Sequence, residues 1–298
     1  MTTILVTGKS GQVGHELLHA LAPLGNVVGC DRIELDLGYP DAIRQKIQQT
    51  RPDVIVNAAA YTAVDKAEAE PDLALRINGA APGILAEEVK RLGALLIHYS
   101  TDYVFDGQRT TPYTEEDPPN PLNVYGKSKL DGELAITKSG CAHLILRTSW
   151  VYSDRGSNFV LTILKLAQER NELSVVNDQT GAPTWARALA ETTAAILSKP
   201  LSFNQINSGI YHLSAAGRTS RYDLAKKIIE TAQQLSGKKT GWAEIRPIPT
   251  ANYPLPATRP PHVVLSNDKI QRVYGVKMTS WENQLMSCLN DVIRTPSS

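Results

Sequence analysis

Residues 4–14, ILVTGKSGQVG, decide the fold, because a short apolar run leads directly into glycines spaced G-x-x-G-x-x-G. Gly8 allows a tight turn after a strand, and Gly11 has no side chain to keep a pyrophosphate away from the backbone. Gly14 allows the following helix to pack closely on the sheet. The free N–H groups at the start of that helix carry partial positive charge that attracts phosphates. The stretch therefore predicts a strand, a phosphate-binding loop and a helix that together bind a dinucleotide.

An acidic residue follows at the position where such folds bind the adenosine ribose. Asp31 comes just after the second apolar run, 17 residues beyond Gly14, and its carboxylate suits a ribose 2′-hydroxyl. Arg32 comes next, and its guanidinium suits a 2′-phosphate. Because the two residues give opposing signals, the sequence predicts a nicotinamide dinucleotide, NADH or NADPH, without choosing between them.

Apolar runs and helix-like segments alternate through the first half of the chain. The runs lie at residues 4–6, 27–29, 54–57, 94–98 and 144–146. Strands that are apolar along their whole length are typical of a parallel sheet covered on both faces, and alternation with helices indicates a doubly wound α/β fold. We predict a Rossmann-type dinucleotide-binding domain over residues 1–150. A smaller, mixed α/β substrate domain is expected mainly over residues 151–298, with later segments crossing back to the first domain.

The second half has a more mixed pattern. We expect helices near residues 159–170, 187–197, 222–235 and 281–293, and short strands at 174–176, 211–213 and 263–265. Prolines gather at residues 112–121 and 247–261. Because proline lacks the N–H that a helix or a strand uses, both stretches are expected to be loops.

Composition and charge exclude several classes of protein. The 298 residues carry 31 Lys and Arg against 30 Asp and Glu, a net charge of +1 that offers no basic surface for nucleic acid. The 42% hydrophobic and 20% charged fractions are those of an ordinary globular protein. We expect neither a membrane span nor a signal peptide, because no apolar run is long enough. Three cysteines form no disulfide or zinc pattern, so we expect buried thiols in a cytoplasmic protein.

Tyr125 and Lys129 form a Y-x-x-x-K motif that indicates proton transfer. Four residues apart, the two side chains lie on one face of a helix that begins after the first proline-rich loop. An ammonium near a phenol favours the phenolate, so we expect Lys129 to lower the pKa of Tyr125 from its usual value near ~10. The phenol could then exchange a proton with a carbonyl oxygen. The same spacing at Tyr222 and Lys226 follows a Ser/Thr-rich turn and indicates a surface pair on a helix.

A polar run, HYSTD at residues 98–102, ends the fourth apolar run. The carboxyl ends of parallel strands form the edge at which such folds bind their ligands. We therefore expect the hydroxyl groups of this run to lie in the same site as Tyr125.

Several motifs resemble those of known enzymes. The glycine spacing resembles that of the extended short-chain dehydrogenase/reductases acting on nucleotide sugars, which keep small residues such as NAAA (57–60) after the third strand. Further runs resemble the dTDP-4-dehydrorhamnose reductase family over nearly the whole chain. They are AAAYTAVDKAE (58–68), HYSTDYVFDG (98–107), PLNVYGKSKLDGE (121–133), RTSWVYS (147–153), NFV (158–160), NDQTGAPT (177–184), Arg259-Pro260 and Trp281.

The resemblance implies the reduction of a sugar ketone. NADPH or NADH would deliver hydride to C4 of dTDP-6-deoxy-L-lyxo-4-hexulose. Tyr125 would donate a proton to the new hydroxyl, Lys129 would hold the nicotinamide ribose, and Thr101 would hold the sugar oxygen. Cofactor residues implied in addition to Gly8, Gly11, Gly14, Asp31 and Arg32 are Gln12, Val13, Asp36, Leu37, Ala59, Ala60, Tyr61, Thr62 and Tyr99. Residues implied at the nucleotide sugar are Thr101, Asp102, Trp150, Asn158 and Arg259.

One position departs from the family pattern. Members of the family have been described with magnesium held by glutamates at a dimer interface; Glu16 matches one such position, but Arg187 falls where a second glutamate is expected. Since arginine cannot ligate a cation, either Arg187 pairs with Glu16 in place of the ion or the dimer is absent. We predict no metal requirement, and a monomer or a homodimer. His15 and His19 have i,i+4 ligand spacing without a third ligand, so we interpret them as surface residues.

Two other functions are compatible with the same scaffold. One is a nucleotide-sugar epimerase or 4,6-dehydratase; a dehydratase of that kind has an Asp-Glu pair after the threonine, whereas Asp102-Tyr103 follows Thr101 here. The other is a non-catalytic, cofactor-binding module, since the regulatory subunit of methionine adenosyltransferase is similar to this family. The presence of Thr101, Tyr125 and Lys129 favours the reductase.

Replacing Asp31 with alanine is expected to change the ratio of NADH to NADPH use more than the rate of the chemical step, because the residue serves only the ribose end. The measurement is the pair of KM values for the two cofactors before and after the substitution. An unchanged ratio would remove Asp31 from the ribose site.

Overall fold

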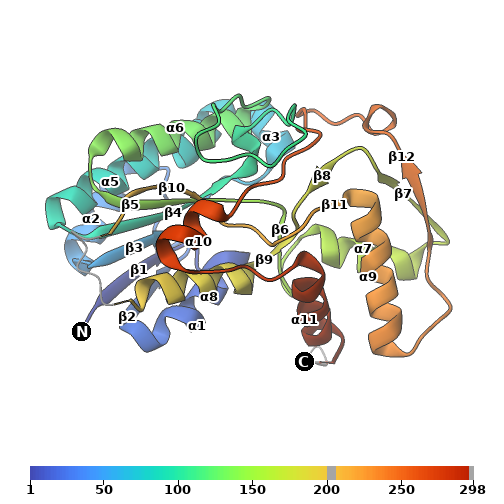
Figure 1. The fold of residues 1–298 in the computed structure, drawn as a ribbon. Helices are drawn as coiled ribbons and strands as arrows, with labels where there is room; N and C mark the ends of the chain where they lie inside the picture. The colour runs from blue at the N-terminus through green and yellow to red at the C-terminus, as the bar shows by residue number, and fades with distance from the viewer. Residues whose placement is uncertain (200–205, 295–298) are drawn as a thin grey trace.

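A six-stranded parallel sheet forms the centre of the larger region (Figure 1), in the order β10-β5-β4-β3-β1-β2. The computed structural model describes residues 1–199 and 206–294; residues 200–205 and 295–298, assigned above to the second domain, lie outside the described residues. The parallel α/β sheet predicted from the apolar runs is confirmed. Its strands are β1 (Thr3–Thr7), β2 (Asn26–Cys30), β3 (Val54–Asn57), β4 (Leu95–Thr101), β5 (Ala142–Thr148) and β10 (Gly209–His212).

Helices cover both faces of the sheet (Figure 1). Side chains alternate along each strand, so Ile4 packs in the layer of α1 and α8, whereas Leu5 packs in the layer of α2 and α5. Burial on both faces is the reason why the strands are apolar at successive positions. One face holds α1 (Gln12–Leu21), α8 (Ala186–Leu197) and α10 (Asp268–Tyr274); the other holds α2 (Pro40–Thr50), α5 (Ala81–Leu92) and α6 (Val124–Ser139). Two short helices, α3 (Val64–Ala69) and α4 (Pro71–Leu75), precede a π-helical stretch (Arg76–Ala80) that leads into α5.

The smaller region has its own core. Leu164, Ile228 and Leu285 pack together from its three helices, α7 (Phe159–Glu169), α9 (Arg221–Ser236) and α11 (Trp281–Arg294). Beside them, β7 (Glu172–Val176) and β12 (Glu244–Ile248) pair in parallel. Two further pairs, β6 (Val151–Tyr152) with β9 (Thr184–Trp185) and β8 (Thr180–Gly181) with β11 (Thr219–Ser220), lie between the large sheet and these helices (Figure 1).

Segments from the second half of the chain belong to the larger region. β10 extends the sheet by pairing with β5, and α8 packs against α1. Tyr211 and Leu213 are buried in the same core as Leu95 of β4. Segments of the second half thus return to the larger region, so the two regions are joined by more than one stretch of chain.

Two expectations for the proline-rich second half are wrong in detail. The described residues 263–265 form no regular strand: Leu265 makes only an isolated bridge to Tyr113, because its neighbours on both sides are loops. Pro247 lies inside β12 and not in a loop. β12 is an edge strand of a two-stranded pair, where the missing N–H of proline is tolerated. A loop with one 3₁₀ turn, Thr250–Asn252, follows as expected.

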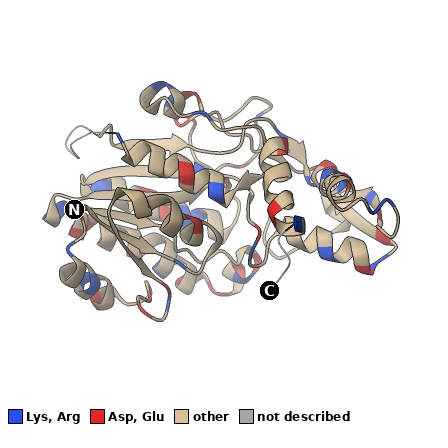
Figure 2. Ribbon diagram, turned by 90° about the horizontal axis from the view of Figure 1, so that it is seen from below, with Lys and Arg blue, Asp and Glu red and all other residues tan. Residues whose placement is uncertain are grey.

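Positions of opposite charge are mixed along the described chain. Figure 2 shows Lys and Arg interspersed with Asp and Glu along the helices of both regions. None of the helices within residues 1–199 and 206–294 combines the length and the hydropathy needed to cross a bilayer.

A buried ion pair fastens α6 to the sheet. Arg147 on β5 donates to both carboxylate oxygens of Glu133, from Nη2 to Oε2 at 2.6 Å and from Nε to Oε1 at 3.0 Å. Ser100 on β4 donates to the same Oε1 at 2.5 Å. Both charged residues are 1% exposed. Because charges at that depth are costly without partners, the pair fixes how α6 lies on the sheet.

Replacing Arg147 with methionine is expected to lower the free energy of unfolding by about 3–5 kcal/mol, because it leaves the Glu133 carboxylate buried and unpaired. The measurement is urea unfolding followed by circular dichroism. The double variant Glu133→Leu/Arg147→Met is the control, since it removes both charges and should recover part of the loss. Equal destabilisation in the single and double variants would contradict this account.

Candidate active site

A cleft of about 1670 Å³ opens at the carboxyl ends of the parallel strands. The strand order reverses between β1 and β3, because the chain runs from β1 outward to β2 and then returns to the other side of β1. Such a switch point is where open α/β sheets bind their ligands. From there the cleft continues between the sheet and the smaller region, where Phe159 and Arg221 line it.

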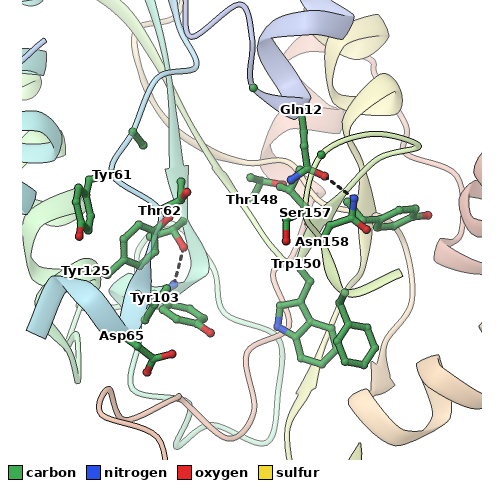
Figure 3. A pocket seen from close by; sticks show the side chains of 18 of the residues that line it. Gln12, Tyr61, Thr62, Asp65, Tyr103, Tyr125, Thr148, Trp150, Ser157 and Asn158 are labelled. Carbon is green, nitrogen blue, oxygen red and sulfur yellow. Dashed lines mark hydrogen bonds between the residues drawn. The ribbon is translucent and has the colours of Figure 1, made fainter. Parts of the chain in front are cut away.

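Nearly all the residues predicted from the sequence to bind the cofactor or the substrate line this one cleft. Gly14 is the exception: a Cβ there would lie 2.0 Å from the carbonyl oxygen of Gly8, so this glycine serves the close approach of α1 to the loop. Tyr61 and Tyr125 lie on one side of the cleft, and Gln12 and Asn158 lie on the other (Figure 3). The lining residues are Gly8, Gly11, Gln12, Val13, Asp31, Arg32, Asp36, Leu37, Ala59, Ala60, Tyr61, Thr62, Tyr99, Thr101, Asp102, Tyr125, Lys129, Trp150, Asn158 and Arg259.

The glycine loop has the features that a dinucleotide pyrophosphate requires. Gly8 has a φ of +76°, and a Cβ there would lie 2.9 Å from the backbone of Ala59. Gly11 is the N-cap of α1, and none of the described side chains caps the first N–H groups of that helix. These donors therefore remain available to an anion in the cleft.

The opposing signals at the ribose end lie side by side. Asp31 Oδ1 accepts hydrogen bonds from the backbone N–H groups of Ile33 at 2.9 Å and Glu34 at 3.2 Å, so it holds the turn after β2. Arg32 pairs with Asp36, with Nε 3.2 Å from Oδ2, and its side chain is 76% exposed. Such an exposed pair costs little to rearrange. Both a carboxylate and a guanidinium therefore face this end of the cleft.

Two tyrosines predicted at the cofactor have their hydroxyl groups already engaged by protein. The Tyr61 hydroxyl donates to Glu70 Oε2 at 2.6 Å, and the Tyr99 hydroxyl lies 2.6 Å from Thr193 Oγ1 on α8. Both residues line the cleft, although the Tyr99 side chain packs in the core beside α8.

Thr101, Tyr125 and Lys129 come together in the cleft. Thr101 ends β4, while Tyr125 and Lys129 lie on one face of α6, as their spacing predicts. The helix begins at Asn123, whose Oδ1 accepts a hydrogen bond from the N–H of Gly126 at 2.8 Å. Thr101 and Tyr125 both line the cleft, and the Thr101 hydroxyl lies near enough to lower the pKa of the Tyr125 phenol. Lys129 Nζ donates to the carbonyl of Tyr99 at 2.6 Å.

The prediction that Lys129 lowers the pKa of Tyr125 is wrong. Burial raises the pKa of the Tyr125 phenol; the Thr101 hydroxyl opposes this shift, and nearby Asp102 adds to it. The Lys129 amine is instead turned toward His98 and Tyr99, and burial lowers the pKa of Lys129 to about 8. Tyr125 is therefore held as the neutral phenol, the form that can donate a proton.

Asp102 and Trp150 form the wall beside the hydroxyl groups. Asp102 is 3% exposed and accepts from Ser149 Oγ at 2.6 Å, and burial raises the pKa of Asp102 to about 6. Trp150 has a φ of +45°, which costs a non-glycine residue about 1–3 kcal/mol. It lies against Gly181, where a Cβ would be 2.5 Å from the indole Cε2. Packing thus holds the indole in place although the backbone of Trp150 is strained.

Arg221 lines the cleft, and the sequence analysis missed it. It begins α9 after the capping residue Ser220, and its Cζ lies 3.6 Å from the ring centroid of Trp150. The ring of Phe159 also contacts Arg221, with its centroid 5.1 Å from the Arg221 Cζ. The local sequence indicates only a turn and a capped helix, so no signal marks Arg221; the packing of α9 against Trp150 brings it to the cleft.

Polar contacts link the lining residues on each side of the cleft. Asn158 Nδ2 donates to Gln12 Oε1 at 3.0 Å (Figure 3), so a residue implied at the nucleotide sugar touches one implied at the cofactor. Arg259 makes a bidentate pair with Asp65 on α3, with Nη1–Oδ1 of 2.6 Å and Nη2–Oδ2 of 2.7 Å. The guanidinium lines the cleft but is already matched by a carboxylate.

Arg187 pairs directly with Glu16, which is one of the two arrangements expected. Its Nε lies 3.0 Å from Glu16 Oε2 and its Nη1 lies 2.7 Å from Asp291 Oδ2, so it joins α1, α8 and α11. Across residues 1–199 and 206–294, no three His, Cys, Asp or Glu side chains are grouped to hold a metal. His15 and His19 lie ring to ring on α1, with centroids 5.0 Å apart.

Comparisons with known proteins agree with this geometry. The family described as RmlD substrate binding domain matches residues 1–294. The chain is 46% identical to the dTDP-4-dehydrorhamnose reductase of Burkholderia thailandensis, over 97% of this chain and 99% of that one. It is 44% identical to that of Escherichia coli K12, over 98% of both chains. The crystal structure of dTDP-4-dehydrorhamnose reductase from Bacillus anthracis in complex with NADP matches with a TM-score of 0.88, at 35% identity, over 97% of this chain and 99% of that one.

A more distant structure shares the fold alone: UDP-glucose 4-epimerase from Thermus thermophilus, at 20% identity, matches with a TM-score of 0.80. The resemblance inferred from the motif runs is confirmed by the family match and by relatives above 40% identity over almost the whole chain. The chain belongs to the dTDP-4-dehydrorhamnose reductase family.

Proposed function

We propose that this protein uses NADPH or NADH to reduce the C4 ketone of dTDP-6-deoxy-L-lyxo-4-hexulose, giving dTDP-L-rhamnose. The observation that carries the proposal is the meeting of Thr101, Tyr125 and Lys129 in the cleft that also contains the glycine loop. Relatives from Burkholderia thailandensis and Escherichia coli are dTDP-4-dehydrorhamnose reductases, and the one from Bacillus anthracis was crystallised with NADP.

The sheet side of the cleft would hold the cofactor. Its pyrophosphate would accept hydrogen bonds from the free N–H groups of α1, next to Gly8 and Gly11. Asp31 and Arg32 would meet the adenosine ribose, and Lys129 the nicotinamide ribose. When bound, the reduced nicotinamide supplies the hydride for the ketone. The remaining cofactor residues we propose are Gln12, Val13, Asp36, Leu37, Ala59, Ala60, Tyr61, Thr62, Tyr99 and Tyr125.

Tyr125 would donate the proton that completes the new hydroxyl. Its raised pKa keeps the phenol protonated at neutral pH, so it can transfer the proton as negative charge develops on the sugar oxygen. The Thr101 hydroxyl would donate a second hydrogen bond to the same oxygen. Asp102 and Trp150 would hold the sugar ring against these two groups.

The nucleotide end of the substrate would lie between Arg259 on one side of the cleft and Asn158 on the other. A guanidinium suits a diphosphate. Arg259 would exchange its Asp65 partner for phosphate oxygens or share its donors between the two. Arg221 adds a second positive charge; among residues 1–199 and 206–294 it has no carboxylate at ion-pair distance.

We extend the proposal to the organisation of the chain. Residues 1–150 would form mainly the dinucleotide-binding domain and residues 151–298 mainly the nucleotide-sugar domain, with α8 and β10 returning to the first. The protein would act as a monomer or a homodimer on a small molecule, without nucleic acid or membrane. The thiols of Cys30, Cys141 and Cys288 are buried and unpaired, which suits the reducing cytoplasm.

The function is tested by the loss of NADPH absorbance with dTDP-4-keto-6-deoxyglucose, with and without the matching 3,5-epimerase. Oxidation only with the epimerase present is expected, because only then is the L-configured ketone formed. Oxidation without it would indicate a C4 reductase of another deoxysugar. Cofactor binding without any oxidation would favour the non-catalytic binding module.

Tyr125→Phe is expected to bind NADPH normally but to turn over roughly 10²–10⁴-fold more slowly, because it lacks the proton that the phenol donates. Turnover and the NADPH dissociation constant are measured separately. Tyr222→Phe, at the other Y-x-x-x-K spacing, is the matched control, since Lys226 Nζ lies 5.6 Å from the Tyr222 ring on α9. Near-normal turnover of Tyr125→Phe would reassign the proton donor.

A further inference from the structure

A row of buried polar side chains lies behind Lys129. Thr7 on β1, Asn57 on β3 and His98 on β4 are 1%, 1% and 0% exposed. The three strands are neighbours, and their register pairs Thr7 with Asn57 and Asn57 with His98. Three polar residues therefore stand side by side on neighbouring strands, each directly after an apolar run.

The contacts along this row are continuous up to the amine. Thr7 Oγ1 lies 2.6 Å from Asn57 Oδ1, Asn57 Nδ2 lies 2.9 Å from His98 Nδ1, and His98 Nε2 lies 3.1 Å from Lys129 Nζ. The carbonyl of Tyr99, 2.6 Å away, is the second contact of the amine. Both ring nitrogens of His98 are thus in use at a depth where an unpartnered polar group costs about 1–3 kcal/mol.

Packing alone does not account for the row. Two residues earlier on the same strands, and on the same face of the sheet, Ile55 and Leu96 fill the layer of α2 and α5 without any polar group to satisfy. An aliphatic residue at position 98 would avoid the cost of burying an imidazole. The row ends at the titratable amine of Lys129 in the cleft, so its polar groups serve to hold that amine by hydrogen bonds.

We propose that His98 is a positioning residue for Lys129: the neutral ring, held from behind by Asn57 and Thr7, accepts a hydrogen bond from the ammonium and fixes it against the Tyr99 carbonyl. The inference rests on the role proposed above for Lys129 at the cofactor. Burial, with Lys129 nearby, holds the pKa of His98 well below its usual value, so the ring stays neutral.

The direction of the hydrogen bonds is coupled to the charge of the amine. When Lys129 is charged, His98 Nε2 must accept, so Nδ1 carries the hydrogen and donates to the oxygen of the Asn57 amide. When Lys129 is neutral, Nε2–H donates to the amine and Asn57 Nδ2 donates to Nδ1. The contacts given above, with Asn57 Nδ2 facing His98 Nδ1, are those of the neutral-amine arrangement. Turning the amide by 180° and moving the ring hydrogen gives the arrangement with charged Lys129.

The charged state gains more from His98 than the neutral state does, since hydrogen bonds to charged groups are the stronger ones. Burial lowers the pKa of Lys129 to about 8, and Glu133, one turn away on α6, opposes that shift. Glu133 is itself paired with Arg147 of β5, and β3 presents only the uncharged Asn57. His98 therefore supports the ammonium, which is present below this pKa and lost as the pH rises through it.

The test compares His98→Gln, which keeps an acceptor near the place of Nε2, with His98→Leu, which has a similar volume and no acceptor. The NADPH dissociation constant and kcat are measured from about pH 6 to about pH 10. In each pH profile, the midpoint of the change at high pH reports the loss of the proton from Lys129; we call this part of the profile the alkaline limb. In His98→Leu its midpoint should move down by about 0.5–1 pH unit, whereas in His98→Gln it should stay within about 0.2 unit. His143→Gln is the matched control, because His143 is a buried strand histidine whose ring contacts the carbonyl of Cys141.

Three outcomes would overturn the proposal. They are an unmoved alkaline limb in a folded His98→Leu, equal shifts in both variants, and the absence of an alkaline limb in the unmodified protein. If His98→Leu does not fold by circular dichroism, His98→Asn takes its place: it keeps a partner for Asn57 but is too short to reach Lys129, so the same shift is expected. If the unmodified protein does not reduce the keto sugar, only the proposed function is overturned. The pH dependence of the NADPH dissociation constant still tests the role of His98.

Discussion

The carboxylate of Glu133 is buried between α6, β4 and β5, and its charge is balanced only if those three elements keep their places. Tyr125, Lys129 and Glu133 follow one another at four-residue spacing, so α6 presents a polar stripe to the sheet where most helices present an apolar one. Two glycines bring α6 close to other neighbouring segments: a Cβ on Gly126 would lie 2.2 Å from the carbonyl oxygen of Tyr103, and one on Gly132 would lie 2.2 Å from that of Asn78. The position of the phenol and the amine thus follows from a requirement for charge pairing.

Much of this arrangement could be predicted because it depends on local patterns. A strand buried on both faces is apolar at successive positions, and a phosphate loop needs glycine where the backbone turns at positive φ, as at Gly8. Helical spacing alone places Tyr125 and Lys129 on one face of α6. The motif runs extended the prediction to residues such as Trp150, whose place in the cleft no periodicity indicates.

What could not be predicted depends on contacts between distant segments. Nothing in residues 218–222 shows that Arg221 stacks on Trp150, because that contact joins α9 to a strained residue after β5. The electrostatics of Tyr125 were predicted with the wrong sign, since burial and the diversion of Lys129 to His98 and Tyr99 outweigh the spacing of the motif. A short strand was expected at residues 211–213 and lies at residues 209–212, but its partner β5 lies more than sixty residues earlier in the chain.

The exchange of segments between the two regions limits how the chain can be divided. A fragment that ended at residue 150 would leave β5 as a bare sheet edge and the apolar side of α1 uncovered, both of which favour aggregation. The complementary fragment would carry a strand and a helix that have no sheet of their own to join. Chimaeras between relatives would therefore need to take β10 and α8 from the same parent as β5 and α1, so that these segments are inherited as one unit although they are separated in the sequence.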